Sequence, residues 1–223
     1  MPFSDRSEAG RQLAKALARY KTDKPVVLAL PRGGVPVAAE IASALDAPLD
    51  LVLVRKIGTP YQPELAAGAV VDGATPTVVR NESIIRLAGI SEADFAAIRD
   101  RELAEIERRR KLYLGDRPRS QMKDRTVIVV DDGVATGATT RAALRAIRAR
   151  KPRRLILAVP VAPTSTLAEL KGEADDIVCL EDHEDFGAIG LFYADFTQVA
   201  DATVTALLAQ HPVKRDPSAT TQA

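Results

Sequence analysis

Residues 126–140, with the sequence TVIVVDDGVATGATT, contain the pattern that decides the fold. The five residues 126–130 are apolar or β-branched and predict a short buried strand. Asp131 and Asp132 follow it, and a Gly- and Thr-rich segment then leads into RAALRAIRAR, which predicts a helix. Free N–H groups and the helix dipole at such an N-terminus favour a bound phosphate. The two carboxylates could accept hydrogen bonds from sugar hydroxyls or lie near a hydrated divalent cation.

Two further apolar strands are predicted to end in cationic segments. Residues 26–30 (VVLAL) are followed by PRGG at 31–34 and then by a predicted helix. Residues 49–54 (LDLVLV) are followed by RKIG at 55–58. Cations and glycines at the carboxyl end of a strand suit an anion. The alternatives are a tight turn with a surface Arg at 31–34, and simple strand termination at 55–58.

The remaining pattern alternates short apolar strands with helices, which predicts an α/β fold with a mostly parallel twisted sheet flanked by helices. Ser4 is the expected N-cap of the first helix, and Ser91 that of a long one. The predicted helices are 5–20, 91–114, 138–150, 163–172 and 198–210. Further strands are predicted at 155–161 and 176–180, and a hairpin-like excursion at 65–71 and 75–79, with a turn at Asp72-Gly73.

Composition limits the function classes. The 223 residues are 46% apolar with a net charge of +1, which suits a single globular domain, residues 1–210, and gives no electrostatic case for nucleic acid. The single cysteine, Cys179, excludes an internal disulfide and favours a reducing compartment. No apolar run reaches the roughly 20 residues of a membrane helix, and no signal peptide is evident, so we expect a cytoplasmic protein without membrane contact. Residues 211–223 are predicted to be a disordered tail.

The central segment resembles the motif by which type I phosphoribosyltransferases bind 5-phosphoribosyl-1-pyrophosphate (PRPP). VIVVDDGVATGATT departs from it only at Gly133, where an aliphatic residue is usual. ALPRGGVPVA is similar to the pyrophosphate loop of the family, and VRKIG occupies the place of its Lys/Arg-bearing loop. With RKIGTPYQPELAAGAV and DFGAIGLFYADF, the resemblance covers most of residues 20–200 and extends to a bacterial subgroup of predicted phosphoribosyltransferases.

The resemblance implies a role for each loop. Asp131 and Asp132 would hold the ribose 2′- and 3′-hydroxyls and lie near Mg²⁺. Lys56, or Arg55, would neutralise pyrophosphate. The phosphate loop, residues 135–139, would surround the 5′-phosphate; its members are Ala135, Thr136, Gly137, Ala138 and Thr139. The pyrophosphate loop, residues 31–34, would contact pyrophosphate through Arg32, Gly33 and Gly34 and contain a non-proline cis peptide.

Two further segments would enclose the reaction. A mobile lid, residues 59–75, would exclude water, and Glu64 is its one candidate base, with a solvated carboxylate as the alternative. A C-terminal hood, residues 181–196, would cover the acceptor. Its aromatic residues, Phe186, Phe192 and Tyr193, would either stack on the acceptor or pack within the hood. Hypoxanthine–guanine enzymes carry an Asp at the position of Ala135, so this chain leaves the acceptor open.

The implied reaction is Mg²⁺-dependent transfer of the phosphoribosyl group from PRPP to a nucleobase-like nitrogen, with pyrophosphate as the product, in nucleotide metabolism. A homodimer is common in such a family. One alternative is a PRPP-sensing regulatory or binding protein without catalysis. Another is a component of a larger enzyme, because the subgroup is sometimes joined to hydrolase-like domains.

Overall fold

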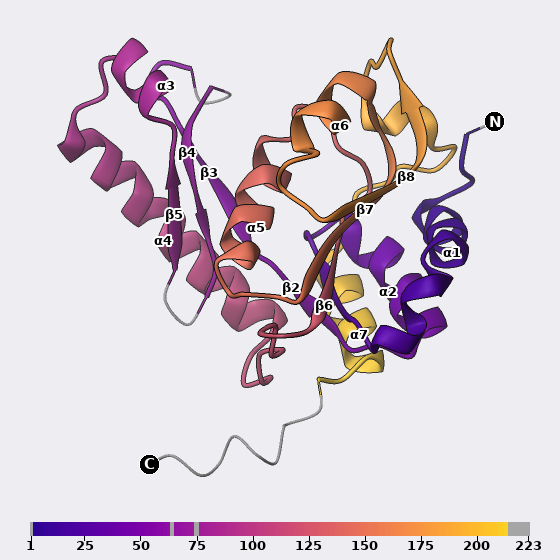
Figure 1. Cartoon of the computed structure of the whole chain (residues 1–223). Coiled ribbons are helices and arrows are strands. Elements are labelled where there is room, and N and C mark those ends of the chain that lie inside the picture. Colours follow the sequence, from indigo (N-terminus) through magenta and orange to yellow (C-terminus); the bar gives the residue numbers. More distant parts are fainter. Residues whose placement is uncertain (1, 63–64, 74–75, 214–223) are drawn as a thin grey trace.

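The computed structural model describes residues 2–62, 65–73 and 76–213 (Figure 1). Its centre is a parallel five-stranded sheet in the order β2-β1-β6-β7-β8. The strands are β1 (Val26–Ala29), β2 (Leu49–Leu51), β6 (Thr126–Val130), β7 (Arg154–Pro163) and β8 (Asp176–His183). The predicted α/β fold with a mostly parallel sheet flanked by helices is confirmed.

Helices cover both faces of this sheet because successive strand side chains point to opposite sides. Val127 and Val129 of β6 pack in one apolar cluster, with residues of α5, whereas Ile128 and Val130 pack in the other, with residues of α1, α2 and α7. The helices are α1 (Arg6–Ala16), α2 (Gly34–Leu45), α3 (Glu82–Leu87), α4 (Glu92–Tyr113), α5 (Ala138–Arg148), α6 (Thr164–Leu170) and α7 (Asp201–Gln210), with short 3-10 helices at Ala18–Asp23 and Ile189–Phe192.

A second sheet corrects the predicted strand 49–54. That strand ends at Leu51, and β3 (Val54–Gly58) pairs antiparallel with β4 (Ala66–Val71), which pairs with β5 (Thr77–Arg80). RKIG is therefore part of a strand, and the predicted hairpin is two strands of a three-stranded sheet. The chain changes sheets at Val52 and Leu53: the Val52 N–H donates to Ala29 in one sheet, and Leu53 accepts from Asp72 beside the other. Helix α4 lies along this second sheet, at the opposite end of the molecule from α1 (Figure 1).

Two capping predictions have different outcomes. Asp5, not Ser4, caps α1: its carboxylate accepts from the Glu8 N–H at 2.7 Å, and the Ser4 N–H instead donates to the Glu8 carboxylate. Ser91 caps α4 as predicted, accepting from the Asp94 N–H at 3.1 Å.

The topology has a switch point between β1 and β6. From β1 the chain adds β2 on one side, and β6 then joins on the other, so the connections after these neighbouring strands leave toward opposite faces. Helix α2 follows β1 and packs on one face, and α5 follows β6 and packs on the other. Ligands of open α/β sheets bind outside the carboxyl ends of the strands at such a switch point.

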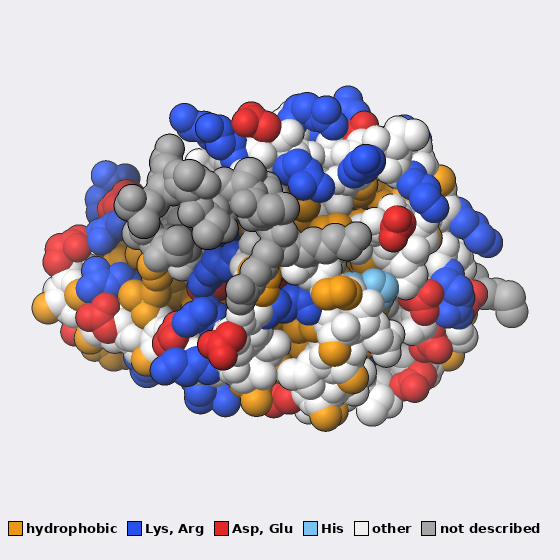
Figure 2. Space-filling model, turned by 90° about the horizontal axis from the view of Figure 1, so that it is seen from below, with side chains coloured by type: hydrophobic (Ala, Val, Ile, Leu, Met, Phe, Trp, Pro, Cys, Tyr) orange, Lys and Arg blue, Asp and Glu red, His pale blue; other side chains and the backbone are white. Residues whose placement is uncertain are grey.

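Across the described ranges, no helix is both long and apolar enough to cross a membrane. On the face shown in Figure 2, Lys and Arg side chains are interspersed with Asp and Glu. Most of the predicted tail lies outside the described residues, as do residues 63–64 and 74–75 of the predicted lid.

Candidate functional site

The carboxyl ends of β1 and β6 bring the pyrophosphate loop against the acid pair. The Leu30 N–H donates to the Val130 carbonyl at 2.9 Å, which fixes the two loops side by side. A Cβ on Gly33 would lie 2.0 Å from an Asp132 carboxylate oxygen, and one on Gly34 would lie 2.7 Å from the Val130 carbonyl oxygen. Both contacts require the absence of a side chain. The Pro31–Arg32 peptide is cis, as the resemblance implied.

The phosphate loop surrounds the N-terminus of α5. Gly137, the N-cap, has φ of 72°, the left-handed region that glycine adopts without steric cost. The Thr166 hydroxyl of α6 donates to the Ala135 carbonyl at 2.7 Å and holds the loop from outside. Thr136, Ala138 and Thr139 are exposed. The first N–H groups of α5 and these hydroxyls can therefore reach an anion.

Asp131 and Asp132 form a partly buried acid pair. The Asp132 N–H donates to Asp131 Oδ1 at 2.9 Å. Burial, and then the neighbouring Asp132 carboxylate, raise the pKa of Asp131 well above its ordinary value. Each of these carboxylates has oxygens that can accept a hydrogen bond from a sugar hydroxyl.

We expect Asp131→Asn to stabilise the fold, increasingly so as pH rises. The unfolded state releases this proton near its ordinary pKa of 3.8, whereas the folded state keeps it to higher pH. Wild-type stability therefore falls as pH rises from about 3.8 toward the raised pKa of Asp131. Asn cannot ionise, and it retains the oxygen that accepts from Asp132.

Urea unfolding at about pH 4 and about pH 7 measures this difference. Asp131→Asn should gain about 1 kcal/mol over wild type at the higher pH and much less at the lower one. Asp116→Asn, at an exposed carboxyl, is the control and should give no such trend. An Asp131→Asn advantage that is absent at the higher pH would contradict a costly buried charge.

Arg6 is a site residue that the sequence analysis did not identify. Its Nε donates to Asp132 Oδ2 at 2.7 Å, and both side chains are only 11% exposed. Its Nη1 donates to the Thr197 carbonyl at 2.9 Å, and its guanidinium lies 3.9 Å from the centre of the Phe196 ring. Arg6 is 126 residues from Asp132 in the sequence. No local pattern marks it, because an Arg in the first turn of a helix ordinarily faces solvent.

Within the hood, aromatic residues pack mainly against one another. Tyr193 is 5% exposed, and its hydroxyl donates to the Asp132 carbonyl at 2.6 Å. In this structure its ring is therefore packed inside the hood and is not exposed to an acceptor. Phe186 and Phe192 stack on each other with centroids 5.0 Å apart, and both are partly exposed. These two rings retain a surface that could meet a ligand.

The departure at Gly133 has a structural counterpart. A Cβ there would lie 2.6 Å from the Ile189 side chain. An aliphatic residue from the hood therefore fills the space beside Gly133. The hood therefore packs closely against the residue that follows the acid pair.

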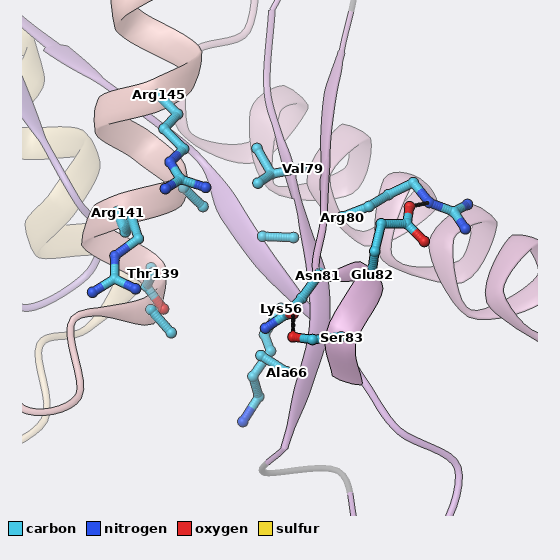
Figure 3. Close-up of a pocket in the computed structure, with 14 residues that line it drawn as sticks. Lys56, Ala66, Val79, Arg80, Asn81, Glu82, Ser83, Thr139, Arg141 and Arg145 are labelled. Carbon is cyan, nitrogen blue, oxygen red and sulfur yellow. Dashed lines mark hydrogen bonds and ion pairs between the residues drawn. The ribbon is translucent and has the colours of Figure 1, made fainter. Parts of the chain in front are cut away.

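The two cations of RKIG differ in their surroundings. Arg55 Nε donates to Glu102 of α4 at 2.8 Å, so an ion pair with a buried carboxylate already engages this residue. Lys56 lines a cavity of about 490 Å³ between β3–β5 and α5, which also includes Thr139 at the edge of the phosphate loop. Figure 3 shows Lys56, Ala66 and Ser83 across this cavity from Thr139, Arg141 and Arg145.

Arg32 and Glu64 are the two remaining residues that the sequence predicted for the site. The Arg32 guanidinium reaches Asp201 at the start of α7 at 3.4 Å, and Asp201 also accepts from the Tyr113 hydroxyl at 2.6 Å. The Arg32 side chain thus links the pyrophosphate loop to α4 and α7. Glu64, the candidate base, lies outside the described residues.

A metal fits this site only with help from a ligand. Among the described residues, no group of three His, Cys, Asp or Glu side chains could hold a metal ion. Mg²⁺ is commonly bound by one or two carboxylates together with substrate phosphates and waters. The adjacent carboxylates of Asp131 and Asp132 suit that kind of binding.

Comparison with known proteins identifies relatives across nearly the whole chain. Residues 6–197 match the family model described as "Phosphoribosyl transferase domain". A Mycobacterium tuberculosis (strain ATCC 25618 / H37Rv) protein, "Putative phosphoribosyl transferase Rv0571c", is 44% identical over 206 residues, which are 92% of this chain and 46% of that protein. The chain thus spans about half the length of the curated relatives it matches.

Solved structures extend this comparison. The crystal structure of TT1426 from Thermus thermophilus is 44% identical, with a TM-score of 0.79, over 96% of this chain and all of that one. AQ2163 from Aquifex aeolicus is 12% identical with a TM-score of 0.51, over 94% of this chain and 87% of that one, and shows a shared fold alone.

Proposed function

The chain belongs to the phosphoribosyl transferase family, and from this membership we propose that it transfers the 5-phosphoribosyl group of PRPP to a nucleobase-like nitrogen and releases pyrophosphate. The observation that carries the proposal is the contact of the pyrophosphate loop with the acid pair, at the switch point of the sheet. PRPP has an anion at each end of a ribose, and this edge offers an anion loop on each side of two carboxylates.

The residues around the switch point are proposed to bind different parts of the ligand. The N–H groups and hydroxyls of the phosphate loop bind the 5′-phosphate. Asp131 and Asp132 bind the ribose hydroxyls, and the backbone of Gly33 and Gly34 approaches the pyrophosphate. Lys56 supplies a cation to the leaving group, on which charge builds as its bond to C1 breaks. The carboxylates also stabilise the cationic sugar that develops there.

Asp131 and Asp132 are the residues that would hold Mg²⁺ together with PRPP. The ion would supply positive charge next to the pyrophosphate oxygens. The negative charge that the acid pair offers to the ion is reduced, because Arg6 forms an ion pair with Asp132.

The acceptor is proposed to bind beneath the hood. Ala135 brings no charge to this side of the phosphate loop. Phe186 and Phe192 offer partly exposed ring faces, which suit a flat heterocycle. A planar nitrogen heterocycle is therefore the acceptor class that we propose, in a reaction of nucleotide metabolism.

Pyrophosphate release tests the proposal. The protein is incubated with PRPP, Mg²⁺ and a panel of purine and pyrimidine bases, and pyrophosphate is measured with a coupled assay. Release that depends on one base supports transfer. PRPP binding without release with any base supports a PRPP-sensing protein instead, and the absence of binding contradicts a PRPP site.

A further inference from the structure

One side chain connects three parts of the molecule around the acid pair. Arg6 begins α1, and its guanidinium contacts Asp132 Oδ2, the Thr197 carbonyl and the Phe196 ring. Phe196 is the last residue of the hood, and Thr197 follows it. Helix α1, the hood and the acid pair therefore meet at a single planar group.

Asp132 is held at both ends by this assembly. Its carboxylate pairs with Arg6, and its carbonyl accepts from the Tyr193 hydroxyl. The Asp132 side chain is 11% exposed, so a small part of it remains accessible beside this ion pair. Arg6 thus fixes the position of one oxygen, Oδ2, and with it the orientation of the whole carboxylate.

The guanidinium is well suited to this task. Its planar donors are arranged in a fixed fork, so that bonds to Asp132 and Thr197 set the direction of both groups. A Lys ammonium is a point charge on a flexible stem and would not fix that direction. The Phe196 ring lies over the face of the guanidinium, and the cation–π attraction between them is stronger where water is partly excluded.

We infer that Arg6 is a positioning residue of the ribose site, which orients the Asp132 carboxylate so that Oδ1 receives a ribose hydroxyl. This inference rests on the proposed function. Arg6 also joins that carboxylate to the hood, so the ribose and acceptor sides of the site share one anchor.

The inference is tested by PRPP binding in the presence of Mg²⁺, measured calorimetrically on the full chain. Arg6→Ala should weaken binding at least tenfold, and Arg6→Lys should weaken it severalfold while retaining the wild-type melting temperature to within a few degrees. Arg11→Ala is the matched control: Arg11 lies on the same helix in an ion pair with Glu40, with its side chain 54% exposed. Its PRPP affinity should equal that of wild type.

Chemical rescue separates positioning from a general structural role. Millimolar guanidinium chloride should restore part of the PRPP affinity of Arg6→Ala, and equal sodium chloride should not. The same additions should leave wild type and Arg11→Ala unchanged. A merely structural Arg6 would give a loss of melting temperature in parallel with affinity and no rescue.

The outcomes distinguish a failure of this inference from a failure of the proposed function on which it rests. If wild type does not bind PRPP, the proposed function fails. If wild type binds and folded Arg6→Ala binds equally well, the Arg6 inference fails alone. If Arg6→Ala does not unfold cooperatively, Arg6→Lys decides: weaker binding with an intact fold supports the inference, whereas equal binding or a second failure to fold overturns it.

Discussion

The double variant Asp131→Asn, Asp132→Asn is expected to lose PRPP binding almost completely. In the proposed complex each carboxylate accepts a hydrogen bond from a ribose hydroxyl. A hydrogen bond to a charged group contributes about 1.5–3 kcal/mol, so two losses predict an affinity reduction of roughly a hundredfold or more. Asn is nearly isosteric, so the shape of the site is retained while its charge is removed.

Calorimetric titration with PRPP and Mg²⁺ measures this effect. The charge-matched control is Asp116→Asn with Asp124→Asn, two exposed carboxylates outside the loops of the proposed site. This control changes the net charge by the same amount and should bind PRPP as wild type does. Unchanged affinity in the Asp131, Asp132 variant would rule out the ribose role of the acid pair. An equal loss in the control would attribute the effect to overall charge.

The expected stability gain of Asp131→Asn and the expected loss of binding in the double variant both follow from the surroundings of the acid pair. A carboxyl that is buried beside another carboxyl costs free energy when it ionises, and the raised pKa of Asp131 reports that cost. Functional groups are commonly kept in such unfavourable surroundings, so their removal stabilises a fold. A structural acid pair would show the opposite combination, with lower stability and no change in binding.

Local sequence patterns predicted the features that arise within one strand–loop–helix unit. The apolar run before Asp131, the glycines of PRGG and the start of α5 all depend on residues close in sequence. The resemblance added what spacing alone does not contain, namely the prediction that these loops bind one ligand. The contact of Gly33 with Asp132 shows that two of the loops lie side by side.

The features that were missed depend on long-range pairing. LDLVLVRKIG contains no Gly or Pro before its last residue, so nothing local shows that the chain leaves one sheet after Leu51 and enters another at Val54. The ion pair between Arg6 and Asp132 joins the first helix to the central loop in the same way. The sequence left two roles open for Tyr193, stacking on the acceptor or packing within the hood, because aromatic residues do both. Its burial favours packing.

Gly33→Ala is expected to reduce PRPP affinity severely while the protein remains folded. Gly33 has φ of −60°, so its backbone accepts an alanine without strain. The added Cβ, however, would lie 2.0 Å from Asp132 Oδ2, the oxygen that pairs with Arg6. The carboxylate must therefore move, and overpacking of this kind typically costs about 1–3 kcal/mol of stability. We expect at least a tenfold loss of affinity, measured by titration with PRPP and Mg²⁺.

The matched control is Gly172→Ala, because a Cβ at that position would have no atom within 4 Å. A double-mutant cycle identifies the colliding group. In an Asp132→Ala background the carboxylate is absent, so Gly33→Ala should cost much less stability there than in wild type. Urea unfolding of the four proteins gives this coupling. Equal costs in both backgrounds would show that the glycine serves something other than its contact with Asp132. A strong coupling would link the pyrophosphate loop to the carboxylate that Arg6 orients, since displacement of one oxygen would disturb both loops of the site.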